Sequence, residues 1–363
     1  MSIVEAELVL PEFPNLFGSR PIIAEPDAVQ RLTPEQQSDF LTYFNLPANQ
    51  QIPPPVRIAN YLFDKTSTLQ YESQTYTAAQ TLVMNKGNCL SLAILTTALA
   101  KLANLDVDYQ LVDSSPVFAL SGNVVNKEVH VKTVVFQNQE MTVDTIIGDQ
   151  LAARVVIDYF VSERRRFIGN LSTAAFDAMY YLNIAGTALA QQDYAKAYWY
   201  TREALEQNPL DPTAWNIMAV VYRRAGQLTK AEEIYLFGIE HAEDKLTLLK
   251  NYHQLLISQM RIAEAAAIEN KLESMDDPSP FHWYSLARNS YDMQDYAAAI
   301  RYFDKALAIA PYLHEAWLGK AQSFYALDAP HKAELALKMA IENADRISTR
   351  SLYEAKLMAL AGK

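Results

Sequence analysis

The chain has 363 residues, of which 50% are hydrophobic, and its net charge is −11. This length and hydrophobic content exclude a largely disordered protein and leave room for two domains. The charge is spread evenly, because 12 basic and 18 acidic residues precede position 171 and 19 basic and 24 acidic residues follow. Nucleic-acid phosphates require clustered Lys and Arg, so we expect no nucleic-acid partner.

The composition also bears on membranes, compartment and redox chemistry. No apolar run reaches the ~20 residues of a membrane span. Glu5 and Glu7 come early and no basic stretch precedes an apolar one, which differs from a secretion signal. We therefore expect a cytoplasmic protein, or an exported or lipid-anchored one if a signal has been removed. The single cysteine, Cys89, excludes intramolecular disulfides and zinc sites with several cysteines.

Prolines mark the first segment of the chain. Nine of the 16 prolines lie within residues 1–55, and three of these are consecutive at 53–55. Proline restricts both its own backbone and that of the preceding residue. We therefore expect residues 1–55 to form an extended arm that packs on the next domain.

Residues 56–170 read as an α+β domain. The apolar spacing predicts a short helix near Ile58, and further helices over 78–84 and 90–103. Alternating β-branched residues then predict strands over 107–112, 128–136 and 141–147. Residues 149–170 are expected to be a helical connector.

Cys89 follows a Gly-Asn break at the start of an apolar helix. With Asn88 as the N-cap, the thiol lies in the first turn, where free N–H groups and the helix dipole favour a thiolate. A lone cysteine is usually a small buried core residue. A core has no need of a cysteine directly after such a break, however, whereas a nucleophile benefits from it.

His130 is the only histidine before the repeats described below. If residues 136–138 form a three-residue hairpin loop, Val135 faces Gln139 and His130 faces Asp144. The imidazole and the carboxylate would then be within hydrogen-bonding reach, although such a pair can also be a simple surface pair. Together with Cys89, the three residues match a nucleophile, a general base and a group that orients the base.

Residues 76–147 resemble the transglutaminase-like superfamily, a branch of the papain-type cysteine fold. The resemblance rests on Lys-Gly-Asn-Cys-Leu-Ser-Leu-Ala, and on a later strand with His and another with Asp. It implies that Cys89 is the nucleophile, His130 the base and acid, and Asp144 the orienting group. Asn88 stands where many members have Asp, and Lys132 stands where many have an aromatic residue. Gln80 is a candidate second oxyanion donor, although a glutamine on a helix is usually just solvated.

The remainder of the chain repeats with a period of 34 residues. An aromatic or leucine column comprises Tyr181, Trp215, Leu249, Trp283 and Trp317. Two further columns hold mostly small residues, which let helices approach closely: Ala197, Ala231, Ala265, Ala299 and Ala333, and then Ala204, Gly238, Leu272, Ala306 and Ala340. The pattern resembles tetratricopeptide repeats. It implies an all-α solenoid over residues 171–363, with five repeats, the third of them the weakest, and a final cap helix.

The repeats also predict a surface for a partner. Residues one, five and eight positions after each aromatic column should point into the face formed by the first helices. They are Asn216, Val220, Arg223, Lys250, Gln254, Ile257, Tyr284, Arg288, Tyr291, Leu318, Gln322 and Tyr325. These aromatic, amide and basic groups predict an extended peptide or acidic protein segment as the partner, although solvated polar positions would give the same pattern.

Two functions are compatible with this sequence. The first is a cysteine-dependent amide or peptide hydrolase or acyltransferase, which forms a thioester on Cys89 and recruits a protein through the repeats. The alternative is a non-catalytic interaction scaffold with a degenerate transglutaminase-like domain. No cofactor is expected. A metal site is disfavoured, because Cys89 and His130 supply two good ligands and a zinc site needs at least three.

Overall fold

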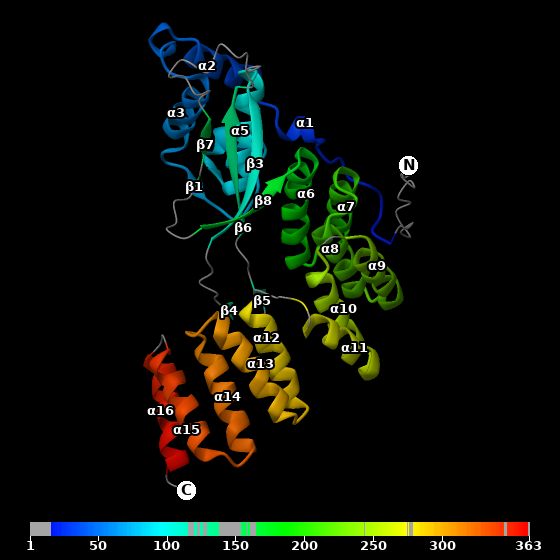
Figure 1. The fold of residues 1–363 in the computed structure, drawn as a ribbon. Helices are drawn as coiled ribbons and strands as arrows, with labels where there is room; N and C mark the ends of the chain where they lie inside the picture. The colour runs from blue at the N-terminus through cyan, green and yellow to red at the C-terminus, as the bar shows by residue number, and fades with distance from the viewer. Residues whose placement is uncertain are drawn as a thin grey trace, which may run out of the picture. The chain divides into compact units, whose positions relative to one another are not determined.

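The computed structural model describes residues 16–114, 120–121, 124–125, 129–137, 154–157, 159, 165–242, 244–273, 275, 279–344 and 347–361. These residues separate into two compact units (Figure 1). The first unit contains the described residues up to 269 except the short strands at 120–121 and 124–125. The second unit contains those two strands and the described residues from 270 onward.

The proline-rich segment is helical rather than extended. Its elements are α1 (Pro26–Val29), α2 (Pro34–Phe44), the 3-10 helix η1 (Pro47–Asn49) and α3 (Pro54–Thr66). Each begins with a proline, because proline has no N–H to lose at the first helical position and its fixed φ suits a helix. The expectation of an extended arm over residues 1–55 was therefore wrong wherever these helices lie. Phe40 of α2 is fully buried in the core of the first unit.

The cysteine-bearing helix lies at the centre of the N-terminal part. Helix α4 (Ala78–Met84) precedes it, and the strands β1 (Gln70–Tyr71) and β2 (Lys86–Gly87) form a parallel pair. Helix α5 (Cys89–Leu102) is buried on all sides from Leu90 to Ala100. A helix that is apolar all round must be surrounded by protein, and the sequence correctly predicted α4 and α5.

A four-stranded antiparallel sheet packs against α5. Its order is β7 (Val155–Ile157), β6 (Val129–Phe136), β3 (Asp106–Ser114) and β8 (Arg165–Leu171). A separate antiparallel pair, β4 (Leu120–Ser121) with β5 (Val124–Val125), belongs to the second unit. The strands predicted over 107–112 and 128–136 are confirmed as β3 and β6.

The prediction of a helical connector over residues 149–170 was wrong. Two strands lie within it, and they form the two edges of the sheet, β7 beside β6 and β8 beside β3. The β-branched triplet Val155–Ile157 suits a strand, and the open edges of β3 and β6 supply hydrogen-bonding partners that a local sequence pattern does not reveal.

In the described part of the chain, ten helices follow the sheet as five successive pairs. The first helices of the pairs are α6 (Thr173–Ala190), α8 (Pro212–Arg224), α10 (Leu246–Ser258), α12 (Pro280–Asp292) and α14 (His314–Ala326). The second helices are α7 (Tyr194–Gln207), α9 (Leu228–His241), α11 (Ile262–Glu273), α13 (Tyr296–Ile309) and α15 (Pro330–Glu342). Helix α16 (Ile347–Ala361) follows and packs on α15.

The columns of the repeat occupy equivalent places in these helices. The alanine column at 197, 231, 265, 299 and 333 is the fourth residue of each second helix and is at most 1% exposed. Gly238 lies so close to the preceding helix that an added Cβ would be 2.9 Å from Cβ of Trp215. The small residues therefore set the distance between paired helices, as their spacing predicted.

A further column lies in the turn between the two helices of each pair. Gln192, Gly226, Met260, Gln294 and Asp328 all have positive φ values, between 55° and 78°. A left-handed residue just after a helix lets the chain reverse and begin the next helix. The spacing of this column is again 34 residues, yet only one of its members is glycine.

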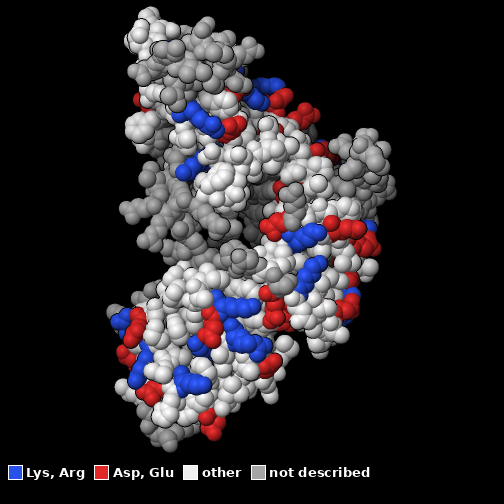
Figure 2. Space-filling model, viewed as in Figure 1, with Lys and Arg blue, Asp and Glu red and all other residues white. Residues whose placement is uncertain are grey.

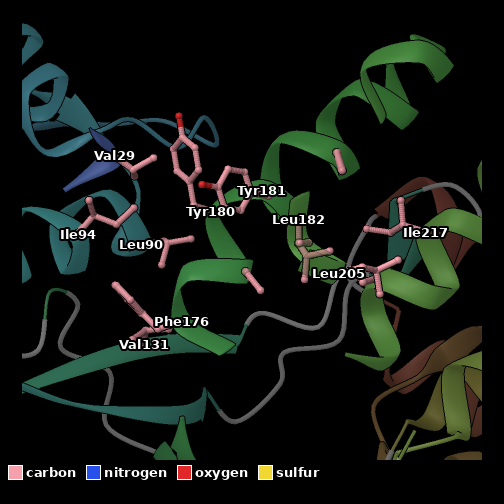
Figure 3. Packing of buried hydrophobic residues seen from close by; sticks show 14 of the residues in the cluster. Val29, Leu90, Ile94, Val131, Phe176, Tyr180, Tyr181, Leu182, Leu205 and Ile217 are labelled. Atoms are coloured by element: carbon pink, nitrogen blue, oxygen red, sulfur yellow. The ribbon is translucent and has the colours of Figure 1, made fainter. Parts of the chain in front are cut away.

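The core of the first unit continues from the sheet domain into the repeats. Figure 3 shows side chains from α1, α5 and β6 packed beside those of α6, and the same cluster extends to Leu205 and Ile217. Helix α6 begins at Thr173, close to the domain boundary predicted at 170/171, but the buried cluster crosses that position. The predicted division into domains stays a prediction.

The two units divide within the weakest repeat. Most residues of α11 are exposed, and the division falls at residues 269 and 270, inside this helix. The second unit has its own buried clusters, one around α12 and α13 and another around α15 and α16. The third repeat has the poorest match to the sequence pattern, which agrees with the exposure of α11.

Candidate functional sites

The surroundings of Cys89 are built by backbone geometry. Asn88 is the N-cap of α5; its side chain accepts a hydrogen bond from the Ser91 N–H at 2.9 Å and donates one to Thr75 at 2.8 Å. Gly87 has φ +154°, and a Cβ there would be 2.7 Å from Ser91. Cys89 is therefore the first residue of the helix, and it is partly exposed. The predicted N-cap is confirmed.

His130 lies on β6, opposite Val112 of β3. Its neighbours Val131 and Thr133 face α5, since Thr133 pairs with Tyr109, whose hydroxyl is 3.1 Å from Thr97 of that helix. Strand residues alternate between faces, so the backbone register places His130 on the other face of the strand.

The predicted hairpin, which would place Asp144 opposite His130, requires Val135 to pair with Gln139, and the structure does not show this pairing. Val135 pairs with Val107 on one side and with Val155 on the other, so Gln139 cannot be its partner. The edge position beside β6 belongs there to β7, a strand much farther along the chain. Asp144 itself lies outside the described residues. The catalytic role of the three residues stays a prediction that this register does not support.

Gln80 has an identified structural role. It is the third residue of α4, where its side-chain oxygen accepts a hydrogen bond from the Thr77 N–H at 3.1 Å, while its own N–H donates to the Thr77 hydroxyl. This reciprocal capping box fixes the start of α4. As an oxyanion donor Gln80 stays untested.

The sequence did not predict the role of Tyr159, whose hydroxyl group lies beside α5. The Tyr159 phenol lies 2.6 Å from the hydroxyls of both Thr96 and Thr133, and burial raises its pKa. It links the helix to β6. No motif pointed to Tyr159, because it lies in the segment expected to be a helical connector.

The repeat positions expected to bind a partner are accessible in both units. In α8, Asn216, Val220 and Arg223 are partly exposed, whereas Ile217 and Tyr222 between them are buried. The same alternation recurs in α10 around Lys250, Gln254 and Ile257, and in α12 around Tyr284, Arg288 and Tyr291. We call these positions, with Leu318, Gln322 and Tyr325 of α14, the first-helix face.

Neighbouring repeats meet along this face. In the first unit Asn251 donates a hydrogen bond to Asn216 at 2.6 Å. In the second unit Arg288 contacts Gln322 at 3.5 Å and lies over the Tyr291 ring at 5.2 Å from its centre. On the side shown in Figure 2 basic and acidic side chains are interspersed over the second unit. Polar and aromatic groups from successive repeats thus form a continuous strip within each unit.

Residues 283–313 match the family model of the tetratricopeptide repeat. The chain carries tetratricopeptide repeats. The match covers α13 and most of α12, and the other four helix pairs follow the same 34-residue register. Repeats of this kind use extended surfaces to bind protein segments, so a protein or peptide is the partner class. No curated protein sequence matches the chain.

Several solved structures resemble part of the chain. PilF of Pseudomonas aeruginosa is 21% identical, covering 50% of this chain and 91% of its own, with a TM-score of 0.40. A tetratricopeptide repeat protein of Parabacteroides merdae is 20% identical over 51% of this chain and 74% of its own, with a TM-score of 0.40. YrrB, described as having an unusual peptide-binding site, is 16% identical over 50% of this chain and 92% of its own, with a TM-score of 0.37.

None of the helices in the described part of the chain is long and apolar enough to cross a membrane. Among the described residues, no group of three or more His, Cys, Asp and Glu side chains is arranged to hold a metal ion.

Proposed function

We propose that the chain is a protein-interaction module that binds an extended segment of a partner along the part of the first-helix face that lies within a single unit. The observation that carries the proposal is the recurrence, within each unit, of partly exposed side chains at equivalent positions of the first helices, beside buried residues. Such a strip offers hydrogen bonds and aromatic contacts at a regular interval, which suits an extended peptide.

The charge of this face indicates the chemistry of the partner. Its twelve positions include Arg223, Lys250 and Arg288 and no acidic residue, in a chain with a net charge of −11. Arg288 remains 38% exposed and has its own intramolecular acid, Asp292, at 3.5 Å. A partner carboxylate can replace that contact with better geometry. We therefore expect acidic segments that also carry aromatic or apolar residues.

The test is selection of random displayed peptides on the immobilised chain, followed by affinity measurement for the enriched sequences. Arg223→Glu combined with Arg288→Glu should weaken binding at least about tenfold, because each like-charge contact costs more than a kcal/mol at a partly desolvated interface. Thermal stability should change by less than about 1 kcal/mol, as for most surface changes.

The matched control is Arg224→Glu combined with Arg301→Glu. Both arginines are exposed and lie outside the first-helix face, and the change in net charge is the same. An equal loss of affinity in the two double variants would mean that the overall charge of the chain, and not the position of the arginines, determines binding. Undiminished binding by the first pair would place the partner on another surface.

A second candidate function is cysteine-dependent acyl chemistry, with Cys89 as nucleophile, His130 as base and Asp144 as orienting group. The position of Cys89 at the first residue of a capped helix favours it, because the positive end of the helix dipole there stabilises a thiolate. The Cys89 thiolate would attack a carboxamide or peptide carbonyl and form a thioester, while the C–N bond breaks and the amine leaves with a proton from His130. Water or a second amine would then attack the thioester, transfer the acyl group to itself and release the Cys89 thiolate. The repeats would deliver the substrate protein.

Iodoacetamide labelling at neutral pH tests this candidate. Cys89 in the folded chain should react at least about tenfold faster than in the urea-unfolded chain, as for a thiol activated by its setting. His130→Gln should remove most of that advantage while leaving the fold intact. A native thiol that reacts no faster than the unfolded one, or that is indifferent to His130→Gln, contradicts the catalytic assignment and leaves the interaction module as the function.

A further inference from the structure

A non-helical stretch of the chain's own N-terminal segment, residues 16–25, packs on the first two repeats. Within the first unit the Phe17 ring stacks on Tyr198 of α7, with centroids 4.7 Å apart, and meets Tyr222 of α8 edge-on at 5.5 Å. The Trp199 indole donates a hydrogen bond to the Phe17 carbonyl at 3.4 Å. Three aromatic side chains thus surround one aromatic residue.

Three residues later the segment presents a cation to two acids. Arg20 is hydrogen-bonded to Glu203, and it lies 3.4 Å from Glu206. The Glu203 side chain is only 6% exposed, and burial raises its pKa while Arg20 opposes that rise. A carboxylate this deeply buried is costly without a charged partner, so the site selects for a cation at this position.

The rest of the segment is held less tightly. Ile22 is fully exposed and Leu16 is 49% exposed. Ile23 and Ala24 pack, partly buried, against the core of the first unit, and the Tyr181 hydroxyl donates a hydrogen bond to the Ala24 carbonyl at 2.8 Å. Among the described residues, residues 16–24 make no backbone-to-backbone hydrogen bond. Segments without backbone hydrogen bonds to the rest of the fold open at low free-energy cost.

We propose that Tyr198, Trp199, Glu203, Glu206 and Tyr222 form a second peptide-recognition site, for a segment of another protein in which an aromatic residue precedes an arginine by three positions. Phe17 and Arg20 occupy this site within the chain and act as a tethered competitor. Four of its residues lie on α7, and Tyr222 lies on the buried side of α8. None of the five belongs to the first-helix face, so the proposal does not depend on the function proposed for that face. Displacement of residues 16–25 exposes the aromatic slot and the buried acid together.

The test uses the full chain and a fluorescein-labelled peptide with the sequence of residues 16–25, followed by fluorescence anisotropy. Phe17→Ala combined with Arg20→Ala removes the competitor, whose effective concentration on a short tether is of the order of mM. This double variant should bind the peptide at least about tenfold more tightly than the unaltered chain. A peptide with the same two substitutions should bind neither protein.

Ile22→Ala is the matched control, because its side chain is exposed and should leave peptide binding at the level of the unaltered chain. Glu206→Ala in the opened chain should weaken peptide binding severalfold. If the double variant does not fold by circular dichroism, Arg20→Ala alone should give an intermediate gain. Equal binding by the opened and unaltered chains, or none by a folded opened chain, overturns the proposal. An exchanged dimer seen by sedimentation would overturn the choice of another protein as occupant.

Discussion

Replacing Trp215 by alanine is expected to lower the free energy of unfolding of the first unit by about 3–5 kcal/mol, the usual loss for a buried tryptophan. Its side chain is fully buried, the ring packs 4.6 Å from Phe237, and the indole donates to the Pro209 carbonyl at 2.8 Å. Truncation leaves a cavity between α8 and α9 and an unpaired carbonyl at the turn before α8. Both losses act on the same helix pair.

Trp317→Ala is the matched control. Trp317 occupies the same column as Trp215, three repeats later. Its indole donates the equivalent hydrogen bond, to the Pro311 carbonyl at 2.8 Å, but its side chain is only partly buried. We expect a loss of about 1–2 kcal/mol there, because less apolar surface is removed from a dry environment. Urea unfolding followed by far-ultraviolet circular dichroism compares the two. Equal losses, or a smaller loss for Trp215→Ala, would contradict the packing described for the first unit.

The repeat half of the fold could be predicted because its signal is redundant. Each column of the 34-residue period carries one packing requirement: Gly238 lies close to Trp215, and Ala204, Ala306 and Ala340 of the same column are fully buried. The left-handed turn column could not be predicted from residue type, because Gln192, Met260 and Gln294 give no sign of a positive φ. The members of this column can be located only by counting from Gly226 in steps of 34 residues.

The N-terminal half was predicted less completely, for two physical reasons. The prolines in residues 1–55 predict an extended backbone, but proline also begins helices, and only the residues after it decide between the two. The edge strands β7 and β8 depend on β6 and β3, which lie far away in sequence. A local hairpin rule therefore paired Val135 with Gln139, whereas its true partner on that side is Val155.

For the candidate sites, the local features were predictable and the long-range ones were not. The Asn88 cap and the placement of Cys89 follow from four consecutive residues. The accessible repeat positions follow from helical periodicity. The stacking of Phe17 on Tyr198 joins residues 181 positions apart, and no pattern in residues 16–25 predicts it. A contact of that kind is visible only once the fold is known.

Asp177→Asn is expected to stabilise the chain above neutral pH and to have little effect in acid. Asp177 lies in α6 between the buried Phe176 and Ala178, and Gln30 of the N-terminal segment donates a hydrogen bond to it at 2.6 Å. Burial raises its pKa to about 6; Lys101 opposes the rise and Asp27 adds to it. The native fold therefore favours the protonated carboxyl, while the unfolded chain ionises near the ordinary value of ~3.9.

The sign of the pH dependence follows from these two values. Below about pH 4 the carboxyl is protonated in both the folded and the unfolded state, and it does not lower the free energy of unfolding. As the pH rises to about 6, the carboxyl ionises in the unfolded state alone, so the free energy of unfolding falls by at most about 3 kcal/mol. Asparagine keeps the oxygen that accepts from Gln30 and cannot ionise. Urea unfolding should therefore show a gain of about 1–2 kcal/mol at pH 8 and almost none at pH 4. Asp64→Asn, at an exposed position of α3, should show no such difference between the two pH values. A loss of stability at pH 8 in Asp177→Asn would mean that the ionised carboxylate is a favourable partner for Lys101 rather than a buried liability.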